Sequence, residues 1–451
     1  MIRALPEAAH MVCARLQEAG HPTYVVGGAV RNLVLGRKPK DIDLATAATP
    51  GDVRKLFRRV IPTGEAHGTV TVLHNGWSFE VTTFRTEAGY TDRRRPDTVT
   101  FVGTIRDDLS RRDFTINGMA LNPQSAEFLD PHGGENDLRA GVIRAIGDPQ
   151  TRFSEDALRL LRAVRFAAEL SFAIEQATWH ALCDQSDGIR LIAVERVREE
   201  LDRILACELP STGFRLMQKS GLLARVLPEL DAGVGVEQRG VHRFDVFEHS
   251  IISCDAAPAD NRIVRLAALL HDVGKPPTLQ VDASGERTFH GHDAASAELA
   301  EQALRRLRYP NAVIQEVVHL IRQHMFHYTP EWTDSAVRRF LARVGLEHVE
   351  NLFELRAADS YAQQGVGTEN RALDQLRTRI AEIEREQHAI TRNDLAVNGH
   401  ELAGAGIPRG PVMGVVIDHL LETVLDDPSQ NSRERLLQIA RQFYESRIRE
   451  E

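Results

Sequence analysis

The sequence has few cysteines and no long apolar run, and these absences exclude several classes of protein. Its four cysteines are scattered and form no CxxC pair, which argues against a disulfide framework or a zinc ribbon and for a reducing cytosol. No run of about 18 apolar residues occurs, so the sequence predicts no membrane span. The first 20 residues show helical spacing rather than the apolar block of a signal peptide. We therefore expect a cytoplasmic protein with no membrane partner.

Positive charge is also scarce. The 55 Lys and Arg residues are outnumbered by 64 Asp and Glu residues, which gives a net charge of −9. A broad basic surface for nucleic acid is therefore not expected, although a local basic groove stays open. A chain of 451 residues is too long for one core and predicts two to four domains.

The pattern of the chain changes near residue 150. Before it, strand patterns at 23–28, 40–46 and 68–84 alternate with helical patterns at 1–20, 29–36 and 49–60. The Asn-Gly pair inside 68–84 predicts a β-hairpin. From about residue 154 onward the pattern is almost entirely helical. We therefore expect an α+β head with a small mixed sheet, followed by helical domains.

Two aspartates, Asp41 and Asp43, stand two positions apart in the short segment 40–46. In a strand, such residues point the same way, about 6.5–7 Å apart. Like charges at that distance repel unless a cation lies between them, and carboxylate oxygens suit Mg²⁺. Two-metal phosphoryl transfer uses such a cluster, to which Glu80 of the hairpin could add a third carboxylate. Taken alone, the D-x-D pattern more often marks solvated acids at the end of a strand.

A glycine pair precedes the aspartates. Gly27 and Gly28 end a strand and open a helix, where free backbone N–H groups could bind a phosphate. Arg31 lies in the first turn of that helix. A glycine pair by itself usually marks only a tight turn, but here the glycines, Arg31 and both aspartates fall within 17 residues. Their combination indicates a nucleotide site.

This combination resembles the class II tRNA nucleotidyltransferase and bacterial poly(A) polymerase family of the polymerase-β superfamily. The resemblance runs to about residue 225 through five ordered blocks, GGAVRNLVLGRKPKDIDLAT (27–46), RRDFTINGMA (111–120), LDPHGGENDL (129–138), EDALRLLRAVRFAAEL (155–170) and VERVREELDRIL (194–205). It implies a polymerase-β-like head followed by a helical neck. One departure is Asn32, where the family usually has Asp, so a charge-dependent contact at that position would be weakened.

The second block contains two adjacent arginines. Arg111 and Arg112 have guanidinium groups that suit triphosphate oxygens, and the resemblance assigns the triphosphate to Arg112. Asn117 could donate a hydrogen bond to a ribose hydroxyl. The alternative is a surface arginine pair with a buried Asn cap.

The fourth block repeats a charge every three residues, at Asp156, Arg159, Arg162 and Arg165. On a helix these residues form one polar stripe. Such a stripe more commonly contains one ion pair between neighbouring residues, with the other arginines solvated. A carboxylate beside a guanidinium also matches the pairing edges of cytosine and adenine and opposes those of guanine and uracil. The resemblance implies that Asp156 and Arg159 select CTP or ATP in this way. Arg162 and Arg165 then contact the nucleotide and its phosphates, or the end of the tRNA.

The segment 85–101 contains Gly, Pro and three successive arginines, which predict a mobile loop. It resembles the flexible loop that family members need to switch from C to A addition. Enzymes that add only CC have a shortened loop, so its presence favours full CCA addition or addition of A alone.

Eight of the 18 histidines lie between His242 and His327. His271 and Asp272 are adjacent in an apolar helix and are costly to bury unless something binds them. Histidine and carboxylate ligands from several helices suit a transition metal such as Mn, Ni or Co. The segment resembles an HD-type metal phosphohydrolase domain, which implies the ligands His249, His271, Asp272 and Asp359, with His292 and His324 for a second metal. A structural HD fold without activity is the alternative.

The sequence thus predicts four parts: a nucleotidyltransferase head (1–145), a neck with the base-selecting helix (146–225), an HD domain (226–370) and a helical tRNA-binding tail (371–451). The predicted function is addition or repair of the 3′-terminal CCA of tRNA from CTP and ATP, with Mg²⁺. One alternative is a poly(A) polymerase, which the pI of about 6.1 disfavours, or an A-only enzyme of the same family. The other is an HD phosphohydrolase that acts on RNA ends or nucleotides. The oligomeric state is not predicted, and the tail could instead be a packing domain.

Overall fold

The computed structural model describes residues 2–88, 98–101, 103–238, 243–364, 370–386 and 390–447. The chain forms two compact units, one of residues 1–232 and 303–309 and the other of residues 233–302 and 310–451. The finer division into four parts stays a prediction. No helix in the described ranges is long and apolar enough to cross a membrane.

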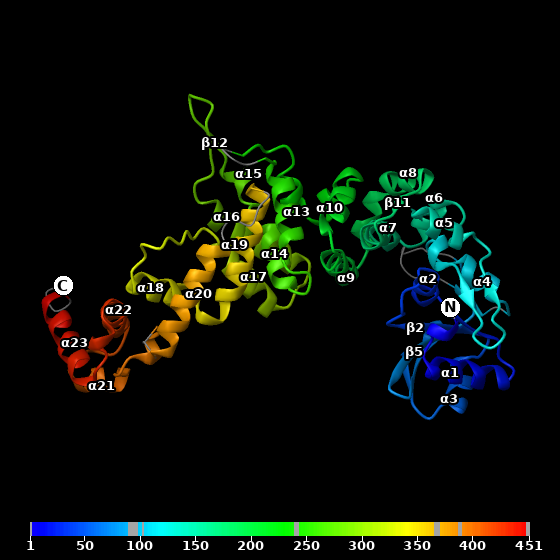
Figure 1. Ribbon diagram of the computed structural model, residues 1–451, viewed down its shortest axis with the longest axis horizontal. Helices are drawn as coiled ribbons and strands as arrows, with labels where there is room; N and C mark the ends of the chain where they lie inside the picture. Colours follow the sequence, from blue (N-terminus) through cyan, green and yellow to red (C-terminus); the bar gives the residue numbers. More distant parts are fainter. Residues whose placement is uncertain are drawn as a thin grey trace. The chain divides into compact units, whose positions relative to one another are not determined.

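A mixed sheet forms the head of the first unit (Figure 1). Among the described residues it has the strand order β3-β4-β5-β2-β1-β8-β9, in which β2 and β5 run parallel and the other neighbours antiparallel. The strands are β1 (Thr23–Val26), β2 (Ile42–Thr46), β3 (Val60–Gly64), β4 (Thr69–His74), β5 (Trp77–Thr83), β8 (Ala120–Leu121) and β9 (Phe128–Leu129). A mixed sheet followed by helices confirms the predicted fold class.

The predicted hairpin is confirmed as β4 and β5. Asn75 and Gly76 both have positive φ (46° and 77°), as the two central residues of a type I′ turn require. A further hairpin of β6 (Arg85–Ala88) and β7 (Thr98–Phe101) begins and ends the predicted mobile loop. The centre of that loop, residues 89–97, lies outside the described residues.

The helices of the head are α1 (Glu7–Glu18), α2 (Gly28–Val34), α3 (Pro50–Leu56), α4 (Ile105–Ser110) and α5 (Gly134–Ala140). Thr49 opens α3 as predicted, with its hydroxyl accepting from the N–H of Asp52 in a capping box. The predicted helical end at residue 60 is wrong, because the chain is already extended at Phe57 and Val60 begins β3. The β-branched pair Val60-Ile61 pairs with β4 instead.

Helices make up the rest of the first unit. They are α6 (Pro149–Glu155), α7 (Leu158–Leu170), α8 (Gln176–Asp184), α9 (Val194–Leu205), α10 (Pro210–Lys219), α11 (Leu223–Val226) and α12 (Pro228–Asp231), with β10 (Val142–Ile143) paired to β11 (Ala173–Ile174). Helix α7 packs against α9 and α10 and is buried on nearly every side, including Arg159 and Arg165. Two charges therefore enter the core of this unit and need partners.

The second unit is helical apart from one short hairpin, β12 (Gln280–Val281) and β13 (Arg287–Thr288), among its described residues. Its helices are α13 (Val246–Ala256), α14 (Arg262–Leu270), α15 (Lys275–Thr278), α16 (His292–Arg306), α17 (Asn311–Gln323), α18 (Asp334–Val344), α19 (Val349–Gln364), α20 (Asn370–Arg385), α21 (Gly399–Gly404), α22 (Pro411–Asp426) and α23 (Arg433–Arg447). Helices α13, α14 and α19 pack together. The last three helices enclose an apolar cluster of their own around Leu402, Leu420 and Leu436.

Candidate active site and metal centre

Three predicted carboxylates come together at the β2–β5 pair. Asp43 of β2 lies directly opposite Glu80 of β5 in the parallel register, and Asp41 precedes β2 by one residue. Burial, the charge of Glu80 and that of Asp41 raise the pKa of Asp43 to about 6, against the opposing effect of Arg112. Like charges that raise a carboxyl pKa in this way are relieved by a bound cation. The three acids are thus placed to hold a divalent ion.

The glycine turn between β1 and α2 faces this cluster. Gly27 has a φ of +65°, and a Cβ on it would lie 3.2 Å from Nη1 of Arg112 and 3.6 Å from Oδ2 of Asp43. The missing side chain lets the backbone, a guanidinium and a carboxylate approach one another. Gly28 follows as the first residue of α2. The turn, the arginine and the acid therefore line one concave surface.

A pocket of about 800 Å³ extends from this surface to α7 and α9. It is lined by ten of the predicted residues: Gly28, Arg31, Asp43, Glu80, Arg112, Asn117, Asp156, Arg159, Arg162 and Arg165. Asp41 is not among its lining residues. Nine arginines and only four acids face the pocket (arginines 31, 85, 111, 112, 159, 162, 165, 196 and 203; acids 43, 80, 113 and 156). That excess of positive charge favours a polyanion such as a triphosphate.

One buried acid, Asp108, holds the Arg111–Arg112 pair. Nη2 of Arg111 lies 2.8 Å from Oδ1 of Asp108, and Nη2 of Arg112 lies 3.2 Å from Oδ2. Among the described residues, Nε of Arg112 is buried without a hydrogen-bond partner. Because an unpaired buried donor is costly, this nitrogen is suited to an anionic ligand.

Asn117 is held by residues on both sides of its amide. Nη1 of Arg31 donates to its oxygen at 2.9 Å, and its Nδ2 donates to Oδ1 of Asp113 at 3.1 Å. Oδ2 of Asp113 accepts from Nε and Nη2 of Arg162 at 2.8 and 2.6 Å. Burial would raise the pKa of Asp113, but Arg162 and Asn117 outweigh it and hold the pKa well below its ordinary value. Asp113 directly follows Arg112 in the second block but was not predicted as a site residue.

Asp156 does not lie on a helix, so the predicted four-residue stripe is wrong at its first member. Helix α6 ends at Glu155, Asp156 is extended (φ −142°, ψ 104°), and α7 begins at Leu158. Oδ1 of Asp156 accepts from the N–H of Leu158 at 3.0 Å, as a capping acid does. Its carboxylate also pairs with Arg196 of α9 at 2.8 Å, a partner that sequence reasoning missed. Helix α7 carries the other three members, Arg159, Arg162 and Arg165.

Acids hold the arginines of α7 in place. Arg159 donates to Glu155 and to two backbone carbonyl oxygens, at 2.8 and 3.1 Å. Arg165 pairs with the buried Glu200 of α9 at 2.7 Å and with Glu169 at 2.9 Å. The pocket side chains of α7 are thus held by partners, as a preorganised binding site requires.

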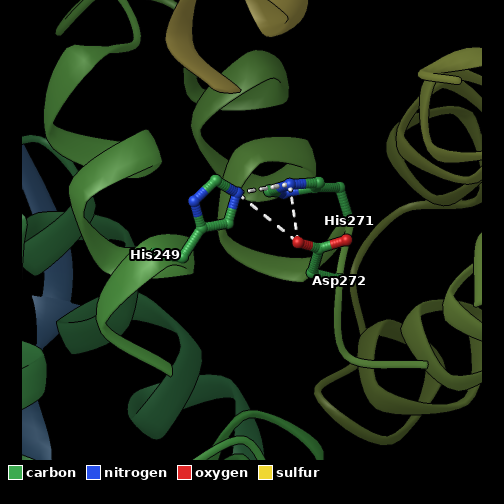
Figure 2. A group of neighbouring side chains, drawn as sticks. All are labelled: His249, His271 and Asp272. Atoms are coloured by element: carbon green, nitrogen blue, oxygen red, sulfur yellow. Dashed lines mark hydrogen bonds and ion pairs between the residues drawn. The ribbon is translucent and has the colours of Figure 1, made fainter. Parts of the chain in front are cut away.

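A second cluster lies buried in the second unit. His249 of α13 meets His271 and Asp272, which follow α14, and each of the three is about 1% exposed. Figure 2 shows their side chains converging, with Nε2 of His249 lying 3.2 Å from Nε2 of His271 and 3.4 Å from Oδ2 of Asp272. Oδ1 of Asp359, from α19, lies 3.0 Å from Nε2 of His249. All four predicted ligands of the first metal are brought together.

The two residues predicted for a second metal lie on the far side of Asp272. Nε2 of His292 is 3.5 Å from Oδ1 of Asp272, and His324 completes a group whose ligand atoms lie within 4.8 Å of one another. Nδ1 of His271, His292 and His324 each contacts a backbone carbonyl at 2.6–2.8 Å. These contacts favour the tautomer that presents an unprotonated Nε2 to the cluster. The residues present therefore fit one or two divalent metal ions with mixed N and O ligands.

The carboxylates of this cluster require positive charge. Burial would lower the pKa of His271, but Asp272 and Asp359 outweigh it and raise that pKa. Nζ of Lys275 lies 2.6 Å from Oδ2 of Asp272 and 2.5 Å from the side-chain oxygen of Gln238. Lys275 stands three residues after Asp272 but was not predicted to take part in the cluster.

Gly274 permits the close approach of the chain to α16. A Cβ there would lie 2.4 Å from the backbone N of Ser296 and 2.5 Å from the carbonyl O of His292. Backbone atoms cannot rotate away, so we expect Gly274→Ala to lower the free energy of unfolding by about 1–3 kcal/mol. Urea unfolding of the full chain measures this. Gly414→Ala, which meets nothing within 4 Å inside α22, is the matched control, and equal stability of the two variants would contradict the packing argument.

Comparison with known proteins adds independent findings. The family model "Poly A polymerase head domain" matches residues 23–144, "Probable RNA and SrmB- binding site of polymerase A" matches 171–233, and "HD domain" matches 239–363. A crystal structure of the Bacillus stearothermophilus CCA-adding enzyme in complex with CTP has a TM-score of 0.75 at 31% identity and covers 98% of both chains. The Thermotoga maritima CCA-adding enzyme complexed with tRNA_CCA shares the fold at 20% identity, with a TM-score of 0.58.

Several curated relatives match along nearly their whole length. The CCA-adding enzyme of Geobacillus stearothermophilus is 33% identical over 427 residues, 94% of each chain. That of Lactiplantibacillus plantarum is 33% identical over 445 residues, 98% of this chain and 97% of the relative. With identity of this level over almost the full length, the chain belongs to the CCA-adding enzyme family.

Proposed function

We propose that this protein adds or repairs the 3′-terminal CCA of tRNA, using CTP and ATP and releasing pyrophosphate. The observation that carries the proposal is the pocket in which Asp43 and Glu80 face the Gly27 turn and Arg112. The whole-length identity to CCA-adding enzymes, one of them solved with CTP, supports the same reaction.

Asp41, Asp43 and Glu80 are the residues that would hold Mg²⁺, since hard oxygen ligands are what this ion prefers. When bound, the ion supplies Lewis-acid activation of the RNA 3′-hydroxyl and of the α-phosphate. Arg112 lies beside Asp43 across the Gly27 turn, where its guanidinium can bind the phosphates and the departing pyrophosphate. The other arginines around the pocket can bind the same negative charge of the phosphates.

Selection of the base falls to Asp156 and Arg159. A carboxylate accepts from the exocyclic amino group of cytosine or adenine, and a guanidinium donates to the adjacent ring nitrogen. The partners of these side chains, Arg196 and Glu155, support the proposal because they hold both in one geometry. Asn117, whose amide is held by Arg31 and Asp113, would contact the ribose. Arg162 and Arg165 lie further along α7 for the phosphates or the end of the tRNA.

The experiment that tests the main proposal is a gel of products from tRNA ending just before CCA. We expect CTP alone to add two residues, CTP with ATP to add three, and ATP alone to add none to this substrate. Absence of CTP incorporation together with A addition would contradict CCA addition and favour the A-only or poly(A) alternative.

All four cysteines are free thiols, which supports a location in the reducing cytoplasm.

The buried His and Asp cluster favours a second activity, metal-dependent phosphohydrolysis. His249, His271, Asp272 and Asp359 would hold one ion, and His292 and His324 would hold another, with Asp272 facing both. Imidazole and carboxylate donors suit Mn²⁺, Ni²⁺ or Co²⁺. Such an ion would supply an activated water for attack on a phosphoester of an RNA end or nucleotide.

We expect His271→Ala to lose the metal of this cluster and all phosphohydrolase activity, while CCA addition stays within about twofold of wild type because the acids of the head are untouched. Metal content by inductively coupled plasma mass spectrometry and hydrolysis of a generic phosphodiester measure the two effects. His180→Ala, an exposed histidine of α8, is the control. An unchanged metal content would contradict the assignment of this cluster as a metal site. Loss of all tRNA-directed activity would instead make hydrolysis the main function.

A further inference from the structure

Asp108 is a fully buried acid in the short helix α4. Its side chain is 0% exposed, and it stands beside Ile105 and Leu109, which belong to an apolar cluster that also contains Phe84. A lone carboxylate in such a place is costly. Burial would raise the pKa of Asp108, but the charges of Arg112 and Arg111 outweigh it and hold that pKa below its ordinary value. The acid is therefore kept ionised by the two arginines.

Both oxygens of Asp108 are engaged. Oδ1 accepts from Nε of Arg111 at 3.0 Å and from the backbone N–H of Arg85 at 3.4 Å. Oδ2 accepts from Nη2 of Arg112 at 3.2 Å. Arg85 begins β6, and all three arginines line the nucleotide pocket. One carboxylate thus joins the first residue of β6 to the guanidinium groups of Arg111 and Arg112, of which that of Arg112 lies beside Asp43.

We propose that Asp108 is a positioning residue for the triphosphate: its carboxylate orders the guanidinium groups of Arg111 and Arg112 before the nucleotide binds. This inference rests on the proposed function, in which Arg112 contacts the phosphates. Free arginine side chains have many rotamers and lose that freedom on binding an anion. Anchoring Arg111 through Nε and Nη2, and Arg112 through Nη2, lowers this loss and leaves Nη1 of Arg112 beside the Gly27 turn, where the phosphates are proposed to bind. Asp108 itself need not touch the substrate.

The variant Asp108→Asn keeps the shape and removes the charge. Loss of a negative charge would by itself strengthen anion binding, whereas loss of order would weaken it. We expect the second effect to win, because each arginine loses a charge-assisted hydrogen bond. The affinity for pyrophosphate should fall, and the KM for CTP and for ATP should rise, each by at least about tenfold. The affinity for CMP should stay unchanged, since CMP lacks the β- and γ-phosphates.

The readouts are equilibrium binding of pyrophosphate and of CMP, with KM and kcat for tRNA lacking CCA. Asp107→Asn, whose carboxylate accepts from Thr104 rather than from these arginines, is the neighbouring control. A merely structural role would reduce kcat and the binding of CMP and pyrophosphate alike, and would overturn the proposal. Unchanged or tighter pyrophosphate binding would overturn it as well.

A double-mutant cycle keeps the proposal falsifiable if the single variant is less stable. If Asp108 acts through the two arginines, adding Asp108→Asn to a variant that already carries Arg111→Ala and Arg112→Ala should change pyrophosphate affinity by no more than about twofold. If the loss of affinity caused by Asp108→Asn multiplies with the loss caused by the arginine substitutions, the assignment is overturned. Failure of the proposed function is distinguishable, because wild-type protein would then add no CTP to tRNA whatever its affinity for pyrophosphate.

Discussion

The Asp43→Asn variant is expected to add nucleotides to RNA at least about a thousandfold more slowly than the wild type. The substitution keeps the shape of the side chain but removes the charge opposite Glu80. Loss of a metal ligand at a phosphoryl-transfer centre costs several kcal/mol of transition-state stabilisation, and each 1.36 kcal/mol is tenfold in rate. Single-turnover incorporation of labelled CTP into tRNA lacking CCA, with excess Mg²⁺, measures the loss. Undiminished incorporation would refute the role of the acids.

The same substitution should not destabilise the fold. The pKa of Asp43 is raised to about 6 by burial and by Glu80, above the ordinary value near 3.8. Folding therefore favours the protonated acid, and stability present below pH 3.8 is lost as pH rises through 6. The Asn variant cannot ionise, so in a chelator it should gain stability relative to the wild type as pH rises from 4 to 7. Thermal unfolding across that range measures the difference, and Asp260→Asn, an exposed acid of the second unit, should show none.

Local patterns predicted the strands β1, β2, β4 and β5 and the helices α1 to α3 of the head, but not β3, β8 and β9 or the order of the strands in the sheet. Period-two alternation and the Asn75-Gly76 turn were sufficient for β4 and β5. The parallel pairing of β2 with β5 places Asp43 opposite Glu80, and it joins strands that are separated by α3, β3 and β4 along the chain. No local rule specifies such a non-consecutive pairing. Glu80 was available to the prediction only as a third acid on a nearby strand.

The buried acids were missed for a related reason. Asp113 meets Arg162, which lies 49 residues further along the chain, and Asp108 and Glu200 stand among apolar residues in amphipathic patterns that are equally typical of solvated acids. Periodicity failed in a different way at Asp156, where charges three residues apart continue across a break between two helices. An acid two residues before an apolar helical run is also a capping signal, and that rule would have placed the break.

The metal cluster was predictable because its residue types are rare in cores. A histidine and an aspartate beside an apolar helix, with further histidines nearby, indicate ligands whatever the details of packing. The prediction that both lie in the helix is wrong, because α14 ends at Leu270 and they form the turn that follows it. The helices α13, α14 and α19, which pack together, supply or precede His249, His271 and Asp359. Lys275 was not predicted as part of the cluster because a single lysine is ordinarily solvated.

Asp156→Asn is expected to lower the preference for CTP over UTP by about tenfold to a hundredfold. In the variant, Oδ1 can keep the N–H of Leu158, which lies 3.0 Å away in the wild type. Nδ2 replaces the oxygen that pairs with Arg196 at 2.8 Å, so it can no longer accept from that arginine. It can instead donate to the carbonyl oxygen that uracil presents where cytosine has an amino group. One such reversal is worth about 1–3 kcal/mol of discrimination. Arg159 still opposes the ring N–H of uracil, so some preference for CTP should remain.

Arg196→Ala distinguishes recognition of the base by Asp156 from the support that Arg196 gives to Asp156. It removes the anchor of Asp156 but leaves the carboxylate that would face the base, so we expect slower addition of every nucleotide and no gain in the use of UTP. The measurement is kcat/KM for each of the four nucleoside triphosphates on tRNA ending before CCA. If Asp156→Asn slows CTP and UTP by the same factor, the carboxylate serves only to cap α7 and to bind Arg196. If Arg196→Ala admits UTP as well as Asp156→Asn does, the base is selected by the position of this turn and not by the hydrogen-bonding character of the group at residue 156.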